Sequence, residues 1–467
     1  MSTKLISERF MPFEDRMREE GLPELVIETF KHHYTRLLEG KTGFIEEKDI
    51  RPVASLPGME TLGEDINHVG QQVVSKTVMI KLNGGLGTSM GLNKAKSLIK
   101  IKDSLSFLDI IARQAIQSGV PLILMNSFAT REDSLQALEH YPELSNSTTG
   151  LDFIQHKVPK IYQDDLGLAL WSQDPQLEWS PPGHGDIYIA LVTSGVLDDL
   201  LDAGFEYAFI SNADNLGAVL DTSLLGYFAQ QQIPFMMEVA KRTESDKKGG
   251  HLAERPDGQL LLRESAQCHR EDMSAFQDIS RYQYFNTNNL WLNLQSLKAT
   301  LTEKNNILDL PFIRNAKTID PRNEKSKPVY QLETAMGSAI VIFKGAQAIQ
   351  VPRARFSPVK TCNDLLVIRS DAYVLTEDNR LQLDSSLRGK PPTIDLDTGY
   401  YKLIDDLETR FPHGVPSLRN CSSLTVKGDI QFGRDITIQG NVHMENSSGS
   451  QFCIEDNTVI TNKMTWN

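Results

Sequence analysis

The chain has few cysteines and no long apolar run, and both shortages restrict what it can be. Only four cysteines occur among 467 residues, and no two of them stand at C-x-x-C spacing. The sequence therefore predicts neither a zinc site nor a disulfide framework. No run of about 18 apolar residues is present to cross a bilayer, and the first ten residues carry charges where a signal peptide needs an apolar core. We expect a soluble protein of the cytoplasm.

Positive charge is also in short supply. The chain has 48 Lys and Arg residues against 61 Asp and Glu residues, which gives a net charge of −13. Nucleic acids and anionic membranes are bound by neutralising their phosphates, so this balance argues against both as partners. Any lysine that binds phosphate must act locally. The length is sufficient for two or three domains with a large core.

What the sequence does contain is a glycine-rich segment, KLNGGLGTSMGLNKAK, over residues 81–96. It follows the apolar residues Val78–Ile80, which predict a short buried strand, and it ends in Lys96. Glycines allow backbone N–H groups to approach an anion closely, so we interpret the segment as a phosphate-binding loop. Leu92 stands where a P-loop requires lysine, and Met90 replaces the last glycine of the dinucleotide fingerprint. A tight turn without a ligand is the simpler alternative.

Helical and strand-like apolar patterns alternate after this loop. Strands are predicted at 120–125, 207–210 and 235–239, and helices at 106–117, from 194 to 201 and after Asp221. This alternation is typical of βαβ units. It predicts a Rossmann-like α/β catalytic domain over residues 71–375 with a mixed, mainly parallel sheet. Residues 1–70 are predicted to form a helical N-terminal segment and a connector.

The last part of the chain has a different pattern. Leu424, Ile430, Ile436 and Val442 stand six residues apart, with glycines between them. A six-residue apolar period indicates the coils of a parallel β-helix, and we assign it to a domain over residues 376–467. Ordinary strands joined by turns would produce the same pattern.

Polar residues follow the predicted strands, where open parallel sheets bind their ligands. Asp214 comes after the strand that ends at Ile210, and a carboxylate in that position facing a polyphosphate is a typical Mg²⁺ ligand. An Asx turn would explain the same residues without a metal. His184 lies between two glycines in the string PPGHGD, where little can pack around it, so we expect it to reach a ligand.

Eight strings, in this order along the chain, resemble those of the eukaryotic-type UDP-glucose pyrophosphorylases, also called UTP–glucose-1-phosphate uridylyltransferases. They are KLNGGLGTSMG (81–91), MNSF (125–128), PPGHGD (181–186), SNADNLGA (211–218), MEV (237–239), KGG (248–250), FNTNNLW (285–291) and RFSPVKTCNDLL (355–366). The resemblance implies a nucleotidyltransferase domain of the GT-A-like type and a left-handed C-terminal β-helix. It also implies the conversion of UTP and glucose 1-phosphate to UDP-glucose and pyrophosphate.

The resemblance further implies which residues act. Lys96, Lys360 and Asp214 would be catalytic, with Asp214 as the ligand of a Mg²⁺ cofactor. The implied substrate-binding residues are Leu82, Asn83, Gly84, Gly85, Gly87, Thr88, Met125, Gln155, Gly183, His184, Asn212, Glu238, Gly250, Asn286 and Asn288. Among these, Gln155 and Gly183 would read uracil, His184 and Asn212 would hold the sugar phosphate, and Glu238 with the FNTNN string would bind glucose hydroxyls.

Several alternatives remain open at this level. The family usually has Gly-Pro before the loop lysine, whereas Lys94 and Ala95 stand here, so Lys94 competes with Lys96 for the phosphate role. Lys360 alone would be interpreted as a solvated lysine. A UDP-sugar pyrophosphorylase of broader or different sugar 1-phosphate specificity would share most of these strings, as would a non-catalytic nucleotide- or sugar-binding homologue. The β-helical end could also support a homo-oligomer.

Overall fold

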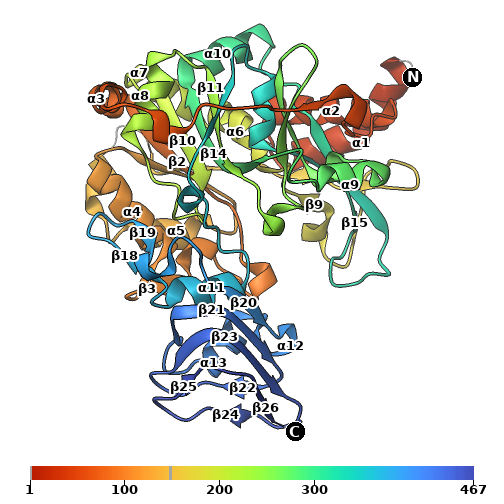
Figure 1. Ribbon diagram of the computed structural model, residues 1–467. Coiled ribbons are helices and arrows are strands. Elements are labelled where there is room, and N and C mark those ends of the chain that lie inside the picture. Colours follow the sequence, from red (N-terminus) through yellow and green to blue (C-terminus); the bar gives the residue numbers. More distant parts are fainter. Residues whose placement is uncertain (1–2, 147–149, 467) are drawn as a thin grey trace.

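The structure is a computed structural model that describes residues 3–146 and 150–466 (Figure 1). Its N-terminal part is a pair of helices, α1 (Thr3–Glu19) and α2 (Glu24–Leu38). Phe10 and Phe13 of α1 pack against Phe30 and Tyr34 of α2, with ring centroids 4.7 to 6.2 Å apart. These four aromatic side chains are buried where the two helices meet.

A ten-stranded mixed sheet forms the centre of the molecule. Its main path is β1 (Arg51–Pro52), β12 (His251–Glu254), β14 (Tyr284–Asn293), β10 (Tyr207–Asn212), β2 (Thr77–Asn83), β5 (Leu122–Asn126) and β6 (Asp152–Ile154), and β11 (Phe235–Lys241), β13 (Leu260–Arg263) and β17 (Gln347–Gln350) join beside it. Strands β10, β2, β5 and β6 are parallel to one another, whereas β14 runs antiparallel to both β10 and β11. The predicted strands at 120–125, 207–210 and 235–239 are confirmed as β5, β10 and β11.

The predicted helices also form, each for a local reason. Helix α4 (Phe107–Ser118) begins at a capping box between Ser106 and Asp109 and ends at Gly119, which has a φ of 65°. The side chain of Asp221 caps α8 (Thr222–Gln230). The helix expected from 194 to 201 forms as α7 (Val196–Asp202), and Gly195, with a φ of 80°, separates it from a preceding helix, α6 (Ile187–Thr193).

Part of the segment interpreted as a connector is helical. Helix α3 (Glu64–Val73) crosses α8 at two glycines, Gly70 and Gly226. A Cβ atom on Gly70 would lie only 1.8 Å from the backbone oxygen of Thr222, so only glycine permits this approach. The remaining helices of the central part are α5 (Arg131–Leu138), α9 (Met273–Phe276), α10 (Leu294–Glu303) and α11 (Cys362–Arg369).

Smaller sheets surround the central one. They are β3 (Lys100–Lys102) with β4 (Leu105–Ser106), β7 (Val158–Pro159) with β9 (Trp179–Ser180), β18 (Tyr373–Leu375) with β19 (Leu381–Leu383), and the three-stranded sheet of β8 (Ile161–Tyr162), β15 (Phe312–Thr318) and β16 (Pro328–Thr334).

The C-terminal part consists of parallel strands at the end of the molecule opposite α1 and α2 (Figure 1). A five-stranded sheet contains β20 (Thr393–Leu396), β21 (Ser417–Lys427), β23 (Thr437–Asn446), β25 (Val459–Ile460) and β26 (Met464–Trp466), and β22 (Ile430–Gln431) pairs with β24 (Phe452–Cys453). Leu424 lies opposite Val442, and both are buried, as are Ile430 and Ile436. The short helices α12 (Thr398–Tyr401) and α13 (Ile404–Arg410) precede β21.

One hydrophobic core is shared between the central sheet and the C-terminal strands. It contains Met79 of β2 and Phe107 of α4 together with Leu424 of β21 and Ile460 of β25. All four cysteines are free thiols. Over 3–146 and 150–466, no helix combines the length and the apolar character needed to cross a membrane.

Candidate functional site

The glycine-rich loop begins where β2 ends, between β10 and β5 at the carboxyl edge of the parallel strands. Asn83 fixes this end, because its side-chain amide donates to Asn126 Oδ1 and Ser134 Oγ, each at 2.8 Å. The loop then closes on itself: Leu86 forms a β-bridge with Ala95, and the backbone N–H of Lys96 donates to Gly85 O at 3.1 Å. The chain thereby returns Lys96 to the edge of the sheet.

Lys96, and not Lys94, points to the predicted metal carboxylate. Lys96 Nζ donates to Asp214 Oδ2 at 2.7 Å, and both side chains are mostly buried. Lys94 is exposed to solvent and is absent from the lining of the cleft described below. The unusual Lys94-Ala95 sequence before the loop lysine therefore leaves Lys96 inside the site.

Asp214 receives a second lysine from a distant part of the chain. Lys360 Nζ lies 3.2 Å from the same Oδ2 atom, although its side chain remains 58% exposed. Burial alone would raise the pKa of Asp214, but the charges of Lys360 and Lys96 outweigh it and hold that pKa below its usual value. The other oxygen, Oδ1, is buried and has no hydrogen-bond partner among the described residues.

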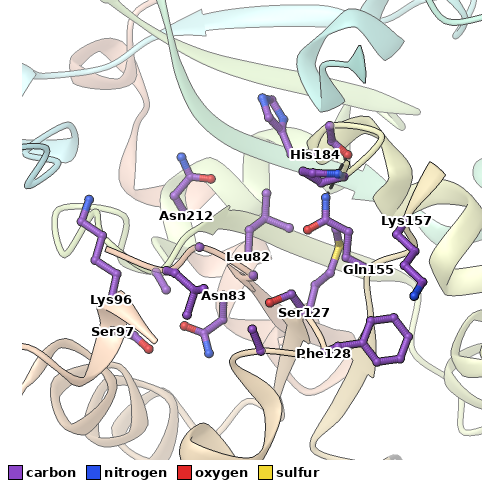
Figure 2. A pocket seen from close by; sticks show the side chains of 18 of the residues that line it. Leu82, Asn83, Lys96, Ser97, Ser127, Phe128, Gln155, Lys157, His184 and Asn212 are labelled. Carbon is purple, nitrogen blue, oxygen red and sulfur yellow. Dashed lines mark hydrogen bonds between the residues drawn. The ribbon is translucent and has the colours of Figure 1, made fainter. Parts of the chain in front are cut away.

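Lys96 and Asp214 stand at one side of a cleft with a volume of about 700 Å³, and Lys360 is not among the residues that line it. The volume is within the range of small-molecule sites. Figure 2 shows Lys96 and Asn212 toward one side, Gln155 and His184 near the middle, and Phe128 with Lys157 toward the other. The predicted residues that line the cleft are Leu82, Asn83, Gly84, Gly85, Thr88, Lys96, Met125, Gln155, Gly183, His184, Asn212 and Asp214. The structure thus brings most of the predicted site together from five strand ends and loops.

The middle of the cleft is built on the PPGHGD string. Gly183 has a φ of 82°, and a Cβ atom there would lie 2.4 Å from the backbone oxygen of Thr334, so the position requires glycine. Gln155 Nε2 donates to Gly183 O at 3.2 Å. The segment after Gln155 is held by Asp186, which accepts from the backbone N–H of His156 at 2.8 Å.

His184 is a neutral side chain in this arrangement. Its Nδ1 atom accepts a hydrogen bond from the backbone N–H of Met336 at 3.0 Å, which assigns the ring proton to Nε2. Burial, with a smaller contribution from the charge of Lys360, lowers the pKa of His184 to about 4. The ring can therefore offer an N–H donor at neutral pH without carrying a charge.

Glu238 is placed differently from the sequence expectation. It is fully buried in β11, and its two oxygens accept from Arg355 at 2.7 Å each, from Trp291 at 2.9 Å and from Asn289 at 3.0 Å. A carboxylate saturated by four donors has no oxygen free for a glucose hydroxyl. The structure corrects the expectation for Glu238, which serves as a buried partner of Arg355.

The other predicted residues outside the cleft lining are Lys360, Gly87, Gly250, Asn286 and Asn288. Gly87 lies inside the loop, where a Cβ atom would approach Leu92 Cδ1 to 2.5 Å. Asn286 and Asn288 lie in β14 at a bulge opposite Glu238 and Val239, and they bond each other at 2.8 Å. This FNTNN segment is therefore an irregular strand and not a free turn.

Sequence reasoning missed three residues that the structure places near the predicted ones. Glu264 abuts Gly250, where a Cβ atom would lie 2.6 Å from either carboxylate oxygen, and burial raises the pKa of Glu264 to about 7. Phe128 and Lys157 line the cleft, with Lys157 Nζ 5.7 Å from the Phe128 ring centroid. Phe128 belongs to the MNSF string and offered a signal, whereas an isolated glutamate such as Glu264 offered none.

The C-terminal part touches both lysine-bearing segments. A Cβ atom on Gly91, in the glycine-rich loop, would lie 3.2 Å from Leu403 Cδ2. Cys362, which opens α11 just after Lys360, donates through Sγ to Lys402 O at 3.2 Å. The residues that precede α13 therefore contact the Lys96 loop on one side and the Lys360 segment on the other.

Comparisons with known proteins point in one direction. The family described as UTP–glucose-1-phosphate uridylyltransferase matches residues 27–439. The enzyme of that name from Saccharomyces cerevisiae is 40% identical over 83% of this chain and 78% of its own length, and the one from Solanum tuberosum is 39% identical over 84% and 82%. A crystal structure of UDP-glucose pyrophosphorylase from Leishmania major has 46% identity and a TM-score of 0.90, covering 98% of this chain and 99% of its own.

Proposed function

This chain belongs to the UTP–glucose-1-phosphate uridylyltransferase family, and we propose that its cleft joins UTP to glucose 1-phosphate, forming UDP-glucose and releasing pyrophosphate. One observation carries most weight: Lys96 and Lys360, from distant parts of the chain, both reach the carboxylate of Asp214 at the edge of the cleft. Such a cluster suits a reaction in which two highly charged phosphates must meet.

The chemistry follows from the groups that are available. A phosphate oxygen of glucose 1-phosphate is already an anion, so it attacks the α-phosphorus in line without a general base and expels pyrophosphate. Lys96 and Lys360 each use one ammonium N–H on Asp214 and keep two for phosphate oxygens. His184, neutral with a pKa of about 4, acts as a hydrogen-bond donor to the sugar phosphate.

Asp214 fits the part of a Mg²⁺ ligand. Its Oδ1 atom is buried without a hydrogen-bond partner among the described residues, and Mg²⁺ in phosphoryl-transfer sites commonly takes one or two carboxylates together with substrate phosphates. Within the described parts of the chain, no group of three or more His, Cys, Asp or Glu residues could hold a metal alone. When bound, Mg²⁺ would neutralise phosphate charge during the reaction.

Other residues recognise the two substrates in this proposal. Gln155 and Gly183 would read the uracil ring, and Asn212 would assist His184 at the sugar phosphate; all four line the cleft. Asn286, Asn288 and Gly250 would bind glucose hydroxyls, with Glu264 replacing Glu238 in that role. Glu264 is favoured because it abuts Gly250, whereas both oxygens of Glu238 are occupied.

Pyrophosphate release tests the function. The enzyme is assayed with UTP and glucose 1-phosphate, and in parallel with galactose 1-phosphate or N-acetylglucosamine 1-phosphate. We expect turnover with glucose 1-phosphate to exceed that with the other two sugars. Comparable turnover on all three would identify a UDP-sugar pyrophosphorylase of broad specificity, and no release with any of them would identify a non-catalytic homologue.

We also propose that residues 376–467 form a short left-handed β-helix on a GT-A-like nucleotidyltransferase domain over 71–375. The parallel pairs Leu424 with Val442 and Ile438 with Ile460 support coils stacked in register. A cytoplasmic location is proposed on the basis of four free thiols.

Self-association through this C-terminal part is a further proposal. Val459 lies on β25 at the edge of the five-stranded sheet and is 57% exposed, which is unusual for a large apolar side chain. A chain truncated near residue 418 would test self-association, but it would also lose residues of the shared core such as Leu424. A point substitution is therefore the better test. We expect Val459→Lys to reduce the mass measured by sedimentation velocity; a monomeric starting protein would contradict the proposal.

A further inference from the structure

The segment that carries Lys360 is held against the Asp214 loop by a buried side chain, that of Asn215. Asn215 is 1% exposed. Its Nδ2 donates to Arg355 O at 3.1 Å and to Asn289 Oδ1 at 3.2 Å, and its Oδ1 accepts from the backbone N–H of Ser357 at 2.9 Å. One side chain therefore satisfies two backbone groups of the segment that leads to Lys360.

The backbones of the two segments pair as well. Asn215 forms an antiparallel β-bridge with Pro358, and the N–H of Val359 donates to Asp214 O at 3.2 Å. This pairing includes Asp214 and reaches Val359, the residue before Lys360, so the two charged side chains start from nearby backbone positions. Their contact at 3.2 Å follows from the pairing.

The far side of Lys360 is fixed independently. The carboxylate of Asp364 accepts from the N–H groups of Lys360 and Thr361, at 2.9 and 2.8 Å, in the capping box of α11. Residue 355 is fixed by the bidentate ion pair of Arg355 with Glu238. Asn215 is the side chain that joins these supports to the Asp214 loop.

At Gly217 the backbones of the two segments lie so close together that no side chain would fit between them. A Cβ atom on Gly217 would lie 2.3 Å from the backbone oxygen of Ala354 and 2.9 Å from the carbonyl carbon of Arg355. The loop and the segment are therefore in contact at two positions. At Asn215 the side chain forms hydrogen bonds to the segment, and at Gly217 the lack of a side chain lets the backbones approach.

We propose that Asn215 is a positioning residue for the transfer reaction, which holds residues 355–360 so that the Lys360 ammonium group stays on Asp214. The inference rests on the proposed function, in which Lys360 neutralises phosphate charge. Without the Asn215 side chain, Asn289 Oδ1 and the N–H of Ser357 lose this partner, Arg355 O keeps only its bond from Asn289, and the segment moves away from the loop. A displacement of about 1 Å in a catalytic group is sufficient to lower a rate by roughly 100-fold.

A double-mutant cycle separates this role from a general loss of structure. The kcat and KM for UTP are measured for the wild type, Asn215→Ala, Lys360→Ala and the double variant. We expect Asn215→Ala to lower kcat by about 10- to 100-fold with little change in KM. In the Lys360→Ala background the same substitution should have almost no further effect, because no ammonium group remains to be positioned.

Two further variants complete the experiment. Asn446→Ala is the matched control, since Asn446 is another buried asparagine with hydrogen bonds to backbone groups. Its side chain donates to Asp429 O and Ser450 O and accepts from the backbone N–H of Ser448. It lies in β23, far along the chain from the cleft, and should leave kcat unchanged. Gly217→Ala disturbs the contact between the same two segments at a second position. If Asn215→Ala folds poorly, Gly217→Ala should show the same decrease in kcat.

Chemical labelling gives a readout that does not depend on turnover. Acetylation of Lys360 by acetic anhydride, followed by mass spectrometry, should accelerate in Asn215→Ala because the amine leaves its ion pair, while labelling of Lys298 should not change. The role of Asn215 would be contradicted if the acetylation rate of Lys360 did not change and the decreases in kcat of the two single variants multiplied in the double variant. The proposed role of Lys360 would then still stand. A Lys360→Ala enzyme with normal turnover would overturn the proposed role of Lys360 and, with it, the need to position that residue.

Discussion

Lys96 Nζ lies 2.7 Å from Oδ2 of Asp214, although the two residues come from different loops at the ends of neighbouring strands. The contact places the cation that we propose to bind phosphate beside the carboxylate that we propose to bind Mg²⁺. Because the pKa of Asp214 is held below its usual value, the carboxylate stays ionised across the neutral range. The site is therefore charged and aligned in advance.

Lys96→Ala should lower kcat by about 100- to 1000-fold, the range for removing one preorganised donor to the transition state. The overall fold should persist, since the Lys96 side chain contributes a single ion pair at the edge of the cleft. Steady-state kinetics and circular dichroism measure the two effects. Lys94→Ala is the control and should keep nearly normal turnover because Lys94 is exposed. The assignment is wrong if the two variants behave alike.

Asp214→Asn should weaken the apparent Mg²⁺ affinity by at least about tenfold, the effect known even for partners outside the ligand shell. The reason is that an amide oxygen would replace the anionic Oδ1 that has no other partner. Activity is titrated with free Mg²⁺ at saturating UTP. Asp198→Asn, which removes only a surface pair with Lys298, is the control. A Mg²⁺ titration identical to that of the wild type would remove Asp214 from the ligand set.

Lys81 should make the stability of the protein depend on pH. It is fully buried, and its amine donates to Ser211 Oγ at 2.7 Å and Ala218 O at 2.8 Å. Burial, assisted by the charge of Arg355, lowers its pKa to about 7 from 10.5. Between these two values the unfolded chain binds more protons than the folded one, so stability rises with pH in this window and is lost as pH falls from 10.5 to 7.

The measurement is chemical denaturation at pH 7, 8 and 9. The wild type should gain up to about 1.4 kcal/mol per pH unit relative to Lys81→Met, because methionine has no proton to lose. Lys76→Met, at an exposed lysine paired with Glu206, should retain the wild-type slope. Equal slopes for the wild type and Lys81→Met would show that Lys81 does not titrate in this window.

Gly183→Ala should raise the KM for UTP and lower the melting temperature. The substitution combines a φ of 82° with a Cβ atom 2.4 Å from Thr334 O, so the loop that accepts from Gln155 must move. Gly195→Ala is matched in φ, at 80°, but meets no atom within 4 Å. It should therefore show only the backbone penalty of about 1 to 2 kcal/mol and a normal KM. Equal effects on KM would contradict the role of Gly183.

Much of this site could be predicted because its residues follow strand ends. The apolar runs predicted β2 and β10, and Lys96 and Asp214 follow those strands, where open parallel sheets bind ligands. That β2 and β10 are neighbours, and that the two side chains are in contact, is known only from the structure. The pattern could not reveal the state of Glu238, because its partners Arg355 and Trp291 are distant in sequence and only the folded sheet brings them to it. Helix α3 was missed for a related reason, since its crossing with α8 depends on a pair of glycines in different segments.

Contact of Leu403 with Gly91, and of Lys402 with Cys362, has a consequence for how the protein is made. The glycine-rich loop leaves the ribosome long before Leu403, the residue that packs against it. Domains generally fold as units during translation, beginning at the N-terminus, whereas this loop meets Leu403 only after that residue has emerged. A nascent chain that stalls before residue 403 would therefore present its phosphate loop unsupported, and chaperone binding should concentrate on chains arrested in that interval.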